Sequence, residues 1–170
     1  MVAKNGKIGV DVYGVKWDMI LGIDPGWNNI GYALIEDNKL IRCGVIKQKD
    51  EIRRLLEIDE AVEKIIRKHG VRTVAVETIF FAKNARSAMK VAEVIGVIRL
   101  AVLRCGADVT GYTPLQVKMA LVGYGRAEKE QVEMMVRSEL GLTRAIRPSH
   151  AADAAAVALT ERFTMNDKSS

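Results

Sequence analysis

Four side chains that could together bind a divalent metal stand at places where a fold could bring them close. Asp24 and Glu77 each end a short apolar run, and His150 and Asp153 open an Ala-rich stretch near the end of the chain. Hard cations such as Mg²⁺ prefer oxygen ligands, and carboxylates on neighbouring strands would lie within range of one shared ion. The four residues therefore predict a metal-dependent site.

Each of these residues has a plainer explanation when it is taken alone. Asp24 precedes a Pro-Gly turn, where aspartate is common, and Glu77 could face water at the edge of a sheet. Asp153 could simply complement a helix dipole, and His150 could be a histidine of the cap region. However, positions i and i+3 of a helix lie about 60° apart, so His150 and Asp153 would share one face. The set of four favours the metal site.

The elements that position these residues follow from the pattern of apolar residues. Three short strands are expected first, over 19–24, 31–35 and 40–46, with turns at Pro25-Gly26 and over 36–39. Strands this closely spaced indicate an antiparallel meander.

Helices and strands then alternate. A helix over 51–69 ends at Gly70, and its apolar positions, which include Ile52, recur at mostly helical spacing. The next elements along the chain are a strand over 71–77, a helix over 84–104 closed by Gly106, and a strand over 108–112. This order predicts an α/β fold in which helices pack on a mixed sheet.

Three more helices are expected after the last strand. One opens at Thr113-Pro114, one covers 127–140 and ends at Gly141, and one covers 149–163 with Ser149 as its cap.

Length and composition favour one globular domain. The chain has 170 residues, of which 49% are apolar, and that is enough for a single core. We assign the domain to residues 19–163. Residues 1–18 precede a second methionine and are either a natural extension or an upstream start that is not used, and residues 164–170 form a polar tail.

Charge and cysteine usage favour a cytoplasmic protein with a polyanionic partner. The chain carries 26 Lys and Arg against 21 Asp and Glu, a net charge of +5. Cys43 and Cys105 form no CxxC motif, which favours reduced thiols over a disulfide or a zinc site. No apolar run approaches the ~18 residues of a membrane span, and the N-terminus lacks the layout of a signal peptide.

The segment after Glu77 is the best candidate for a nucleic-acid surface. Phe80 and Phe81 precede three cations, Lys83, Arg86 and Lys90, which would line one side of the following helix. Both aromatic residues could belong to the core, but strand alternation would turn at most one of them inward.

The helix over 84–104 carries apolar residues around more than half of its circumference. A helix of this kind is buried on two sides. It is either a central helix of a single domain or a helix with one side on the sheet and the other on a twofold-related partner.

Several motifs follow one another along the chain. They are Ile20-Leu-Gly-Ile-Asp-Pro-Gly26, Val76-Glu-Thr-Ile-Phe-Phe-Ala-Lys-Asn-Ala85, Gln116-Val-Lys118, Val122-Gly-Tyr-Gly125 with Ala127-Glu-Lys129, and His150-Ala-Ala-Asp-Ala154. In this order they resemble the motifs of the RuvC family of bacterial Holliday-junction resolvases, and the similarity covers roughly residues 19 to 163. The resemblance implies an RNase H-like fold with a mixed five-stranded sheet flanked by helices.

The resemblance also implies a function. Members of the family are homodimeric endodeoxyribonucleases that nick two strands of like polarity at a four-way junction during homologous recombination and DNA repair. They require a divalent metal, here Mg²⁺ or Mn²⁺ with two ions per site, and act with the RuvA–RuvB branch-migration complex. Asp24, Glu77, His150 and Asp153 would be the catalytic, metal-binding set. Many members carry a carboxylate at the position of His150, whereas others carry a histidine. The histidine of this chain therefore affects which metal the site would prefer.

The resemblance assigns DNA contacts too. Phe80 would stack on a base that is unpaired near the junction centre, and Lys118 and Lys129 would contact backbone phosphate. Without the resemblance, both lysines would be explained as solvated surface residues. The full DNA-binding set is Phe80, Lys83, Asn84, Arg86, Lys90, Lys118 and Lys129.

Two other functions fit parts of the pattern. An Asp-x-Gly motif after a strand also opens the phosphate loop of actin-like ATPases and sugar kinases, although no second phosphate loop is evident and the chain is short for a two-lobed fold. The chain could also be a junction-binding structural protein, or another RNase H-like nuclease that acts on RNA–DNA hybrids.

Overall fold

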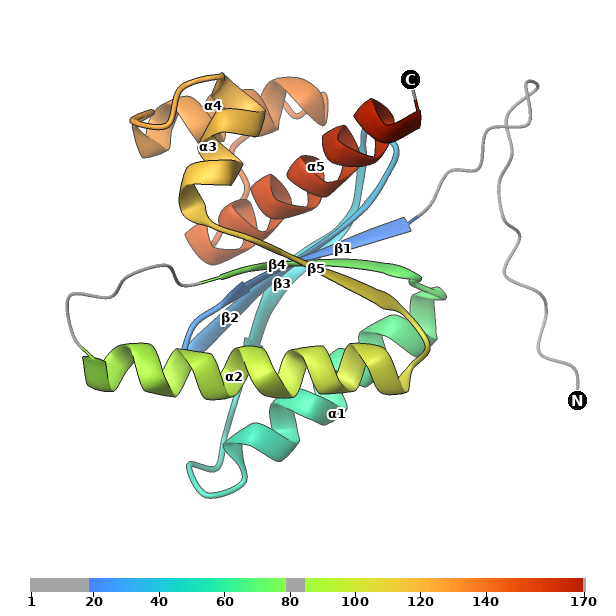
Figure 1. Cartoon of the computed structure of the whole chain (residues 1–170), viewed down its shortest axis with the longest axis vertical. Coiled ribbons are helices and arrows are strands. Elements are labelled where there is room, and N and C mark those ends of the chain that lie inside the picture. Colours follow the sequence, from blue (N-terminus) through green and yellow to red (C-terminus); the bar gives the residue numbers. More distant parts are fainter. Residues whose placement is uncertain (1–18, 79–84, 170) are drawn as a thin grey trace, which may run out of the picture.

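A mixed five-stranded sheet forms the centre of the molecule (Figure 1). The computed structural model describes residues 19–78 and 85–169. The strands lie in the order β3-β2-β1-β4-β5, with β1, β2 and β3 antiparallel and β4 and β5 parallel to β1. Their bounds are β1 Met19–Pro25, β2 Asn29–Glu36, β3 Lys39–Lys47, β4 Thr73–Glu77 and β5 Asp108–Tyr112. The predicted antiparallel meander and the predicted order of strands and helices along the chain are confirmed.

Five helices cover the two faces of the sheet (Figure 1). Helices α1 and α2 lie on one face, and α3, α4 and α5 lie on the other. Their bounds are α1 Arg54–His69, α2 Ala85–Arg104, α3 Pro114–Val122, α4 Lys129–Glu139 and α5 Ser149–Ser169. Side chains alternate along each strand, so β1 sends Leu21 and Ile23 into the core under α1 and α2, and Ile20 into the core under α5.

The start of α1 differs from the prediction. The helix begins at Arg54 rather than at residue 51, and Ile52 is 96% exposed instead of packing on the apolar face. The Asp50 side chain accepts hydrogen bonds from the backbone N–H groups of Ile52 (2.8 Å) and Arg53 (3.3 Å). Aspartate thus closes a local turn that competes with the first turn of the helix.

Other helix ends agree more closely with the sequence. Gly70 ends α1 in the left-handed conformation, with a φ of 64°. Thr113 caps α3, with Gln116 completing a capping box. The last helix differs at both ends: Ser149 is its first residue rather than a flanking cap, and the helix continues to Ser169, six residues beyond the predicted end at 163.

Two glycines let α5 approach the sheet closely. A Cβ atom at Gly22 would collide with the Ala154 carbonyl oxygen, and one at Gly31 would collide with the His150 carbonyl group. The helix meets these strands with alanines, among them Ala154 and Ala158, which are fully buried. Glycine on the strands and alanine on the helix therefore set the distance between the start of α5 and the end of β1.

Two further predictions concerned the cysteines and membrane-spanning helices. Cys43 and Cys105 are both free thiols, as predicted. Within residues 19–78 and 85–169, no helix combines the length and the apolar character that crossing a bilayer requires.

Candidate metal centre

Asp24 and Glu77 lie at the ends of two adjacent parallel strands. The last paired residues of β1 and β4 are Ile23 and Val76, so the two acids occupy the next position on each strand. Parallel strands end at the same edge of a sheet, and the carboxylates consequently meet there. The sequence-based juxtaposition of Asp24 and Glu77 is confirmed.

The first turn of α5 brings two more candidate ligands to the same edge. One ligand atom each of Asp24, His150 and Asp153 lies within 4.8 Å of the others. His150 Nδ1 and Asp24 Oδ2 are 2.7 Å apart, within hydrogen-bond distance. The spacing of His150 and Asp153 thus places both on the face that meets β1.

Glu77 lies outside this group of three but is electrostatically coupled to it. Burial raises the pKa of Glu77 to about 7, and the charges of Asp24 and Asp153 and a hydrogen bond with Asp24 add to the effect. Burial also raises the pKa of Asp24, with Asp153 adding to the effect and the His150 hydrogen bond opposing it. Two carboxyl groups whose pKa values are raised, Asp24 and Glu77, lie with the Asp153 carboxylate and the His150 imidazole, and together they form a donor set that suits a divalent cation.

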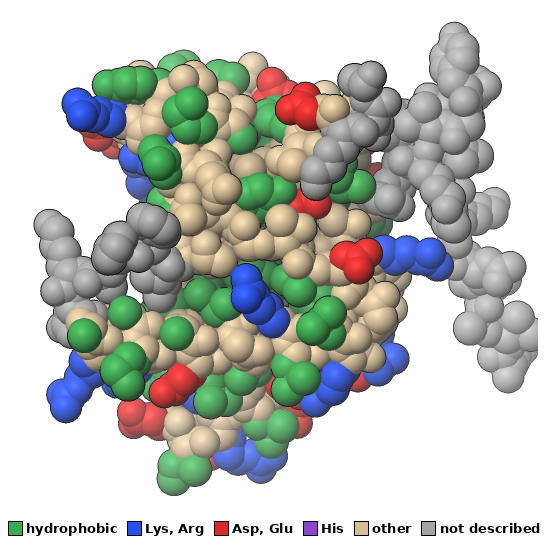
Figure 2. Space-filling view, viewed as in Figure 1, with side chains coloured by type: hydrophobic (Ala, Val, Ile, Leu, Met, Phe, Trp, Pro, Cys, Tyr) green, Lys and Arg blue, Asp and Glu red, His purple; other side chains and the backbone are tan. Residues whose placement is uncertain are grey.

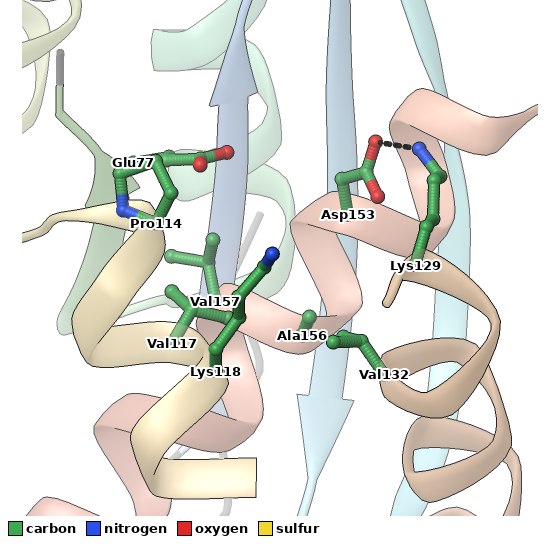
Figure 3. Close-up of a pocket in the computed structure, with 9 residues that line it drawn as sticks. All are labelled: Glu77, Pro114, Val117, Lys118, Lys129, Val132, Asp153, Ala156 and Val157. Carbon is green, nitrogen blue, oxygen red and sulfur yellow. Dashed lines mark hydrogen bonds and ion pairs between the residues drawn. The ribbon is translucent and has the colours of Figure 1, made fainter. Parts of the chain in front are cut away.

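Lys129 contacts this cluster directly, which the sequence did not predict. Its Nζ lies 2.7 Å from Asp153 Oδ2. Partial burial acts to lower the pKa of Lys129, but the hydrogen bond with Asp153 and the neighbouring negative charges together raise it above its ordinary value. Lys118 lines the same pocket, and its ammonium points into the space between Glu77 and Asp153 (Figure 3). Both lysines predicted to contact phosphate are therefore at the site, and one of them already pairs with a candidate ligand.

The pocket beside the acids is about 300 Å³ in volume. Its polar side is formed by two acids, Glu77 and Asp153, and by two lysines, Lys118 and Lys129. Helices α3, α4 and α5 supply the apolar lining (Figure 3). The apolar lining residues are Pro114, Val117, Val132, Ala156 and Val157.

A tryptophan next to the site also escaped the sequence analysis. Trp27 follows the Asp-Pro-Gly turn, and two cations stack on its ring: the guanidinium of Arg54, 4.7 Å from the ring centroid, and the ammonium of Lys90, at 4.9 Å. Arg54 also donates a 2.7 Å hydrogen bond to the Trp27 carbonyl oxygen. Lys90, predicted to bind DNA, is thus held near the turn after Asp24, and the position of Trp27 after that turn was the available signal.

Other predicted DNA contacts are not all described by the structure. Arg86 lies exposed in the first turn of α2. Phe80, Lys83 and Asn84 lie outside the described residues, so their roles stay predictions.

A buried polar pair braces the strand next to Glu77. Tyr112 lies opposite Glu77 in the β4–β5 register, and its hydroxyl donates a 2.8 Å hydrogen bond to the Glu161 carboxylate of α5. Burial raises the pKa of Tyr112 to about 12. The pair links the end of β5 to the helix that carries His150.

A mixed five-stranded sheet with an acidic cluster at the ends of its central strands defines the class of RNase H-like nucleases. The chain belongs to the family described as crossover junction endodeoxyribonuclease RuvC, whose family model matches residues 20–161.

Curated relatives and solved structures agree with this assignment. The chain is 45% identical over 147 residues to the RuvC of Campylobacter curvus, covering 83% of this chain and 94% of that protein. It is 41% identical over 148 residues to the RuvC of Wolinella succinogenes, covering 83% and 91%. The structure of T. thermophilus RuvC in complex with a Holliday junction substrate matches with a TM-score of 0.83 and 36% identity, covering 89% and 96%.

A more distant match supports the fold alone. The yeast mitochondrial Holliday junction resolvase Ydc2 aligns with a TM-score of 0.63 at 14% identity, covering 89% of this chain and 81% of that one. The family and the fold predicted from the sequence are confirmed.

Replacing Gly31 with alanine should lower both stability and activity. Gly31 pairs with Asp24 across the strands and lies under His150, so a methyl group there would push the start of α5 away from β1. We expect a loss of about 1 to 3 kcal/mol in the free energy of unfolding, and a fall in cleavage rate beyond what unfolding explains. Gly44→Ala on β3, where the atoms nearest to the added Cβ belong to the Tyr32 side chain rather than to backbone, is the matched control. Equal specific activity for the two folded variants would contradict the positioning role of Gly31.

Proposed function

We propose that this protein resolves Holliday junctions in homologous recombination and DNA repair. It would nick two strands of like polarity symmetrically, using divalent metal. The observation that most directly supports this proposal is the cluster of Asp24, His150 and Asp153 beside Glu77, in a chain of the RuvC family. Relatives that bear the name crossover junction endodeoxyribonuclease support the choice of substrate.

The four candidate ligands would hold the metal, for which we propose two Mg²⁺ ions, with Mn²⁺ as an alternative. When bound, such ions supply an activated water and neutralise charge on the leaving group in an in-line displacement. The water oxygen bonds to phosphorus while the bond to the 3′ oxygen breaks. Lys118 and Lys129 add positive charge on the side where the phosphate would approach.

The test is cleavage of a synthetic four-way junction beside linear duplex and RNA–DNA hybrid, with Mg²⁺ or Mn²⁺. Paired symmetric nicks on the junction alone are the expected result. Cleavage of the hybrid without junction preference would instead assign a hybrid-specific nuclease. Junction binding without cutting under every metal condition would assign a structural protein.

The outer face of α2 supports a homodimer. Val94, Ile98 and Val102 on this helix are buried against the sheet and α1. On another side Met89, Leu100 and Leu103 are 67%, 54% and 61% exposed, respectively. Figure 2 shows hydrophobic side chains gathered along α2 on the face in view. Covering this face with a twofold-related copy would place two metal centres on a twofold-symmetric junction.

Charging that face should separate the subunits. The double variant Met89→Glu with Leu100→Glu is expected to sediment as a monomer at micromolar concentration and to lose paired nicking, because two carboxylates cannot be buried unpaired in an apolar contact. Ile52→Glu, at a fully exposed position away from α2, is the control. A parent protein that is monomeric in the presence of junction DNA would remove the dimer proposal.

Changing His150 to aspartate should change the metal preference. Imidazole is a softer ligand than carboxylate, so we expect the parent to favour Mn²⁺ over Mg²⁺ more strongly than His150→Asp does. The measurement is the ratio of cleavage rates in the two metals for both proteins. An unchanged ratio would show that His150 does not set the preference.

Further contacts are proposed by family membership. The DNA-binding set is Phe80, Lys83, Asn84, Arg86, Lys90, Lys118 and Lys129, and the partners are four-way junction DNA and the RuvA–RuvB complex. The proposed location is the cytoplasm.

A further inference from the structure

The loop that joins α3 to α4 is held by contacts at both of its ends, and it connects the helices that carry Lys118 and Lys129. Gly123 ends α3 in the left-handed conformation, with a φ of 75°. Ala127 is fully buried, and its N–H donates a 3.1 Å hydrogen bond to the Tyr124 carbonyl oxygen. Both ends of the loop are therefore fixed.

This loop nevertheless exposes a large aromatic side chain. Tyr124 is 56% exposed, and Leu115 and Met119 on α3 are 60% and 50% exposed. The backbone of Gly125 folds back against α3, because a Cβ there would collide with Leu115 and lie 3.6 Å from the Met119 sulfur. The loop thus runs beside the first turn of α3, which begins at a residue lining the pocket. We call Leu115, Met119, Tyr124 and Arg126 the α3–α4 patch.

Positive charges accompany the apolar surface. Arg126 follows the loop glycine and is exposed, and Lys118 lies between Leu115 and Met119 in the sequence of α3. Figure 2 shows hydrophobic and basic side chains next to one another over the α3–α4 region. Aromatic and apolar side chains interleaved with cations match a nucleic-acid strand, which presents flat base faces along a chain of phosphates. An apolar protein partner would gain nothing from the cations.

We propose that the α3–α4 patch binds the DNA strand that runs on from the metal centre, with Tyr124 stacking on an unpaired base and Arg126 contacting a phosphate. This inference rests on the proposed function. It adds a second aromatic contact to that function, on the face of the sheet that α3 and α4 cover, whereas α2 covers the other face.

The test compares junction binding by Tyr124→Ala, Tyr124→Phe and the parent, measured by fluorescence anisotropy over a range of salt concentrations. Loss of stacking should weaken binding by Tyr124→Ala about 5- to 100-fold with an unchanged salt slope, whereas the phenylalanine variant should bind like the parent. Arg126→Gln should instead reduce the salt slope by about one. Met134→Ala, an equally exposed apolar position on α4, is the matched control.

The outcomes separate this inference from the proposed function. If the parent binds and nicks the junction but Tyr124→Ala binds equally well, the patch is not a DNA contact. If Tyr124→Ala alters sedimentation while junction affinity is unchanged, the patch contacts protein and the inference is wrong. If the parent neither binds nor cuts the junction, the proposed function itself fails. Thermal melting of each variant checks that the fold is retained.

Discussion

Asp24→Asn should cut a four-way junction slower than the parent by a factor on the order of 10³ or more, with junction affinity changed less than about threefold. The substitution keeps the size of the side chain but removes the charge that would hold a metal between β1 and α5. A loss of 10³ corresponds to about 4 kcal/mol of transition-state stabilisation, which is reasonable for one group that directly organises charge.

Folding can be separated from chemistry in this variant. Because burial raises the pKa of Asp24, its ionised form destabilises the metal-free protein, and Asp24→Asn should melt at the same temperature as the parent or higher in EDTA. Single-turnover cleavage, anisotropy and thermal melting on one preparation give all three quantities. A near-parent cleavage rate in a well-folded variant would exclude metal catalysis through Asp24.

The metal-free protein should lose stability as pH rises from about 5 to about 8. Burial raises the pKa of Glu77 to about 7 in the folded protein, against an ordinary value of 4.5, so the folded state holds this proton more tightly. The associated stabilisation is fully present below the unfolded pKa and is lost as pH rises through the folded pKa. The shift corresponds to roughly 3 kcal/mol over that window.

Urea denaturation in EDTA at several pH values measures this effect. Glu77→Gln should flatten the pH dependence, because the amide does not titrate, and should lose cleavage as Asp24→Asn does. Added Mg²⁺ should stabilise the parent more at the higher pH, since ionised carboxylates are the ligands. A parent protein whose metal-free stability rises over this pH range would show that Glu77 is ionised at little cost in the fold.

Local patterns predicted the frame of the site well. The alternation of apolar residues located all five strands, and the order of elements allowed the strands bearing Asp24 and Glu77 to be neighbours, as they are in the sheet. The predicted start of α1 was wrong because the side chain of Asp50 closes a turn just before the helix. The spacing of apolar residues does not reveal how strong such a turn is.

Contacts between distant side chains were beyond sequence reasoning. The pairing of Lys129 with Asp153 depends on how α4 approaches α5, and the stacking of Arg54 and Lys90 on Trp27 depends on the angle between three elements. A long side chain can reach many partners, and only the packed structure selects one. The close approach of α5 was more accessible, because glycines within strands and an Ala-rich helix together indicate tight packing.

The candidate centre draws its ligands from segments that are far apart in the chain. His150 and Asp24 are 126 positions apart in the chain. They meet only when β1 has joined the sheet and α5 has packed against Gly22 and Gly31 of the strands. Nascent and partly unfolded chains therefore lack the constellation and would leave DNA intact. The topology therefore makes the candidate centre of this nuclease depend on a complete tertiary structure.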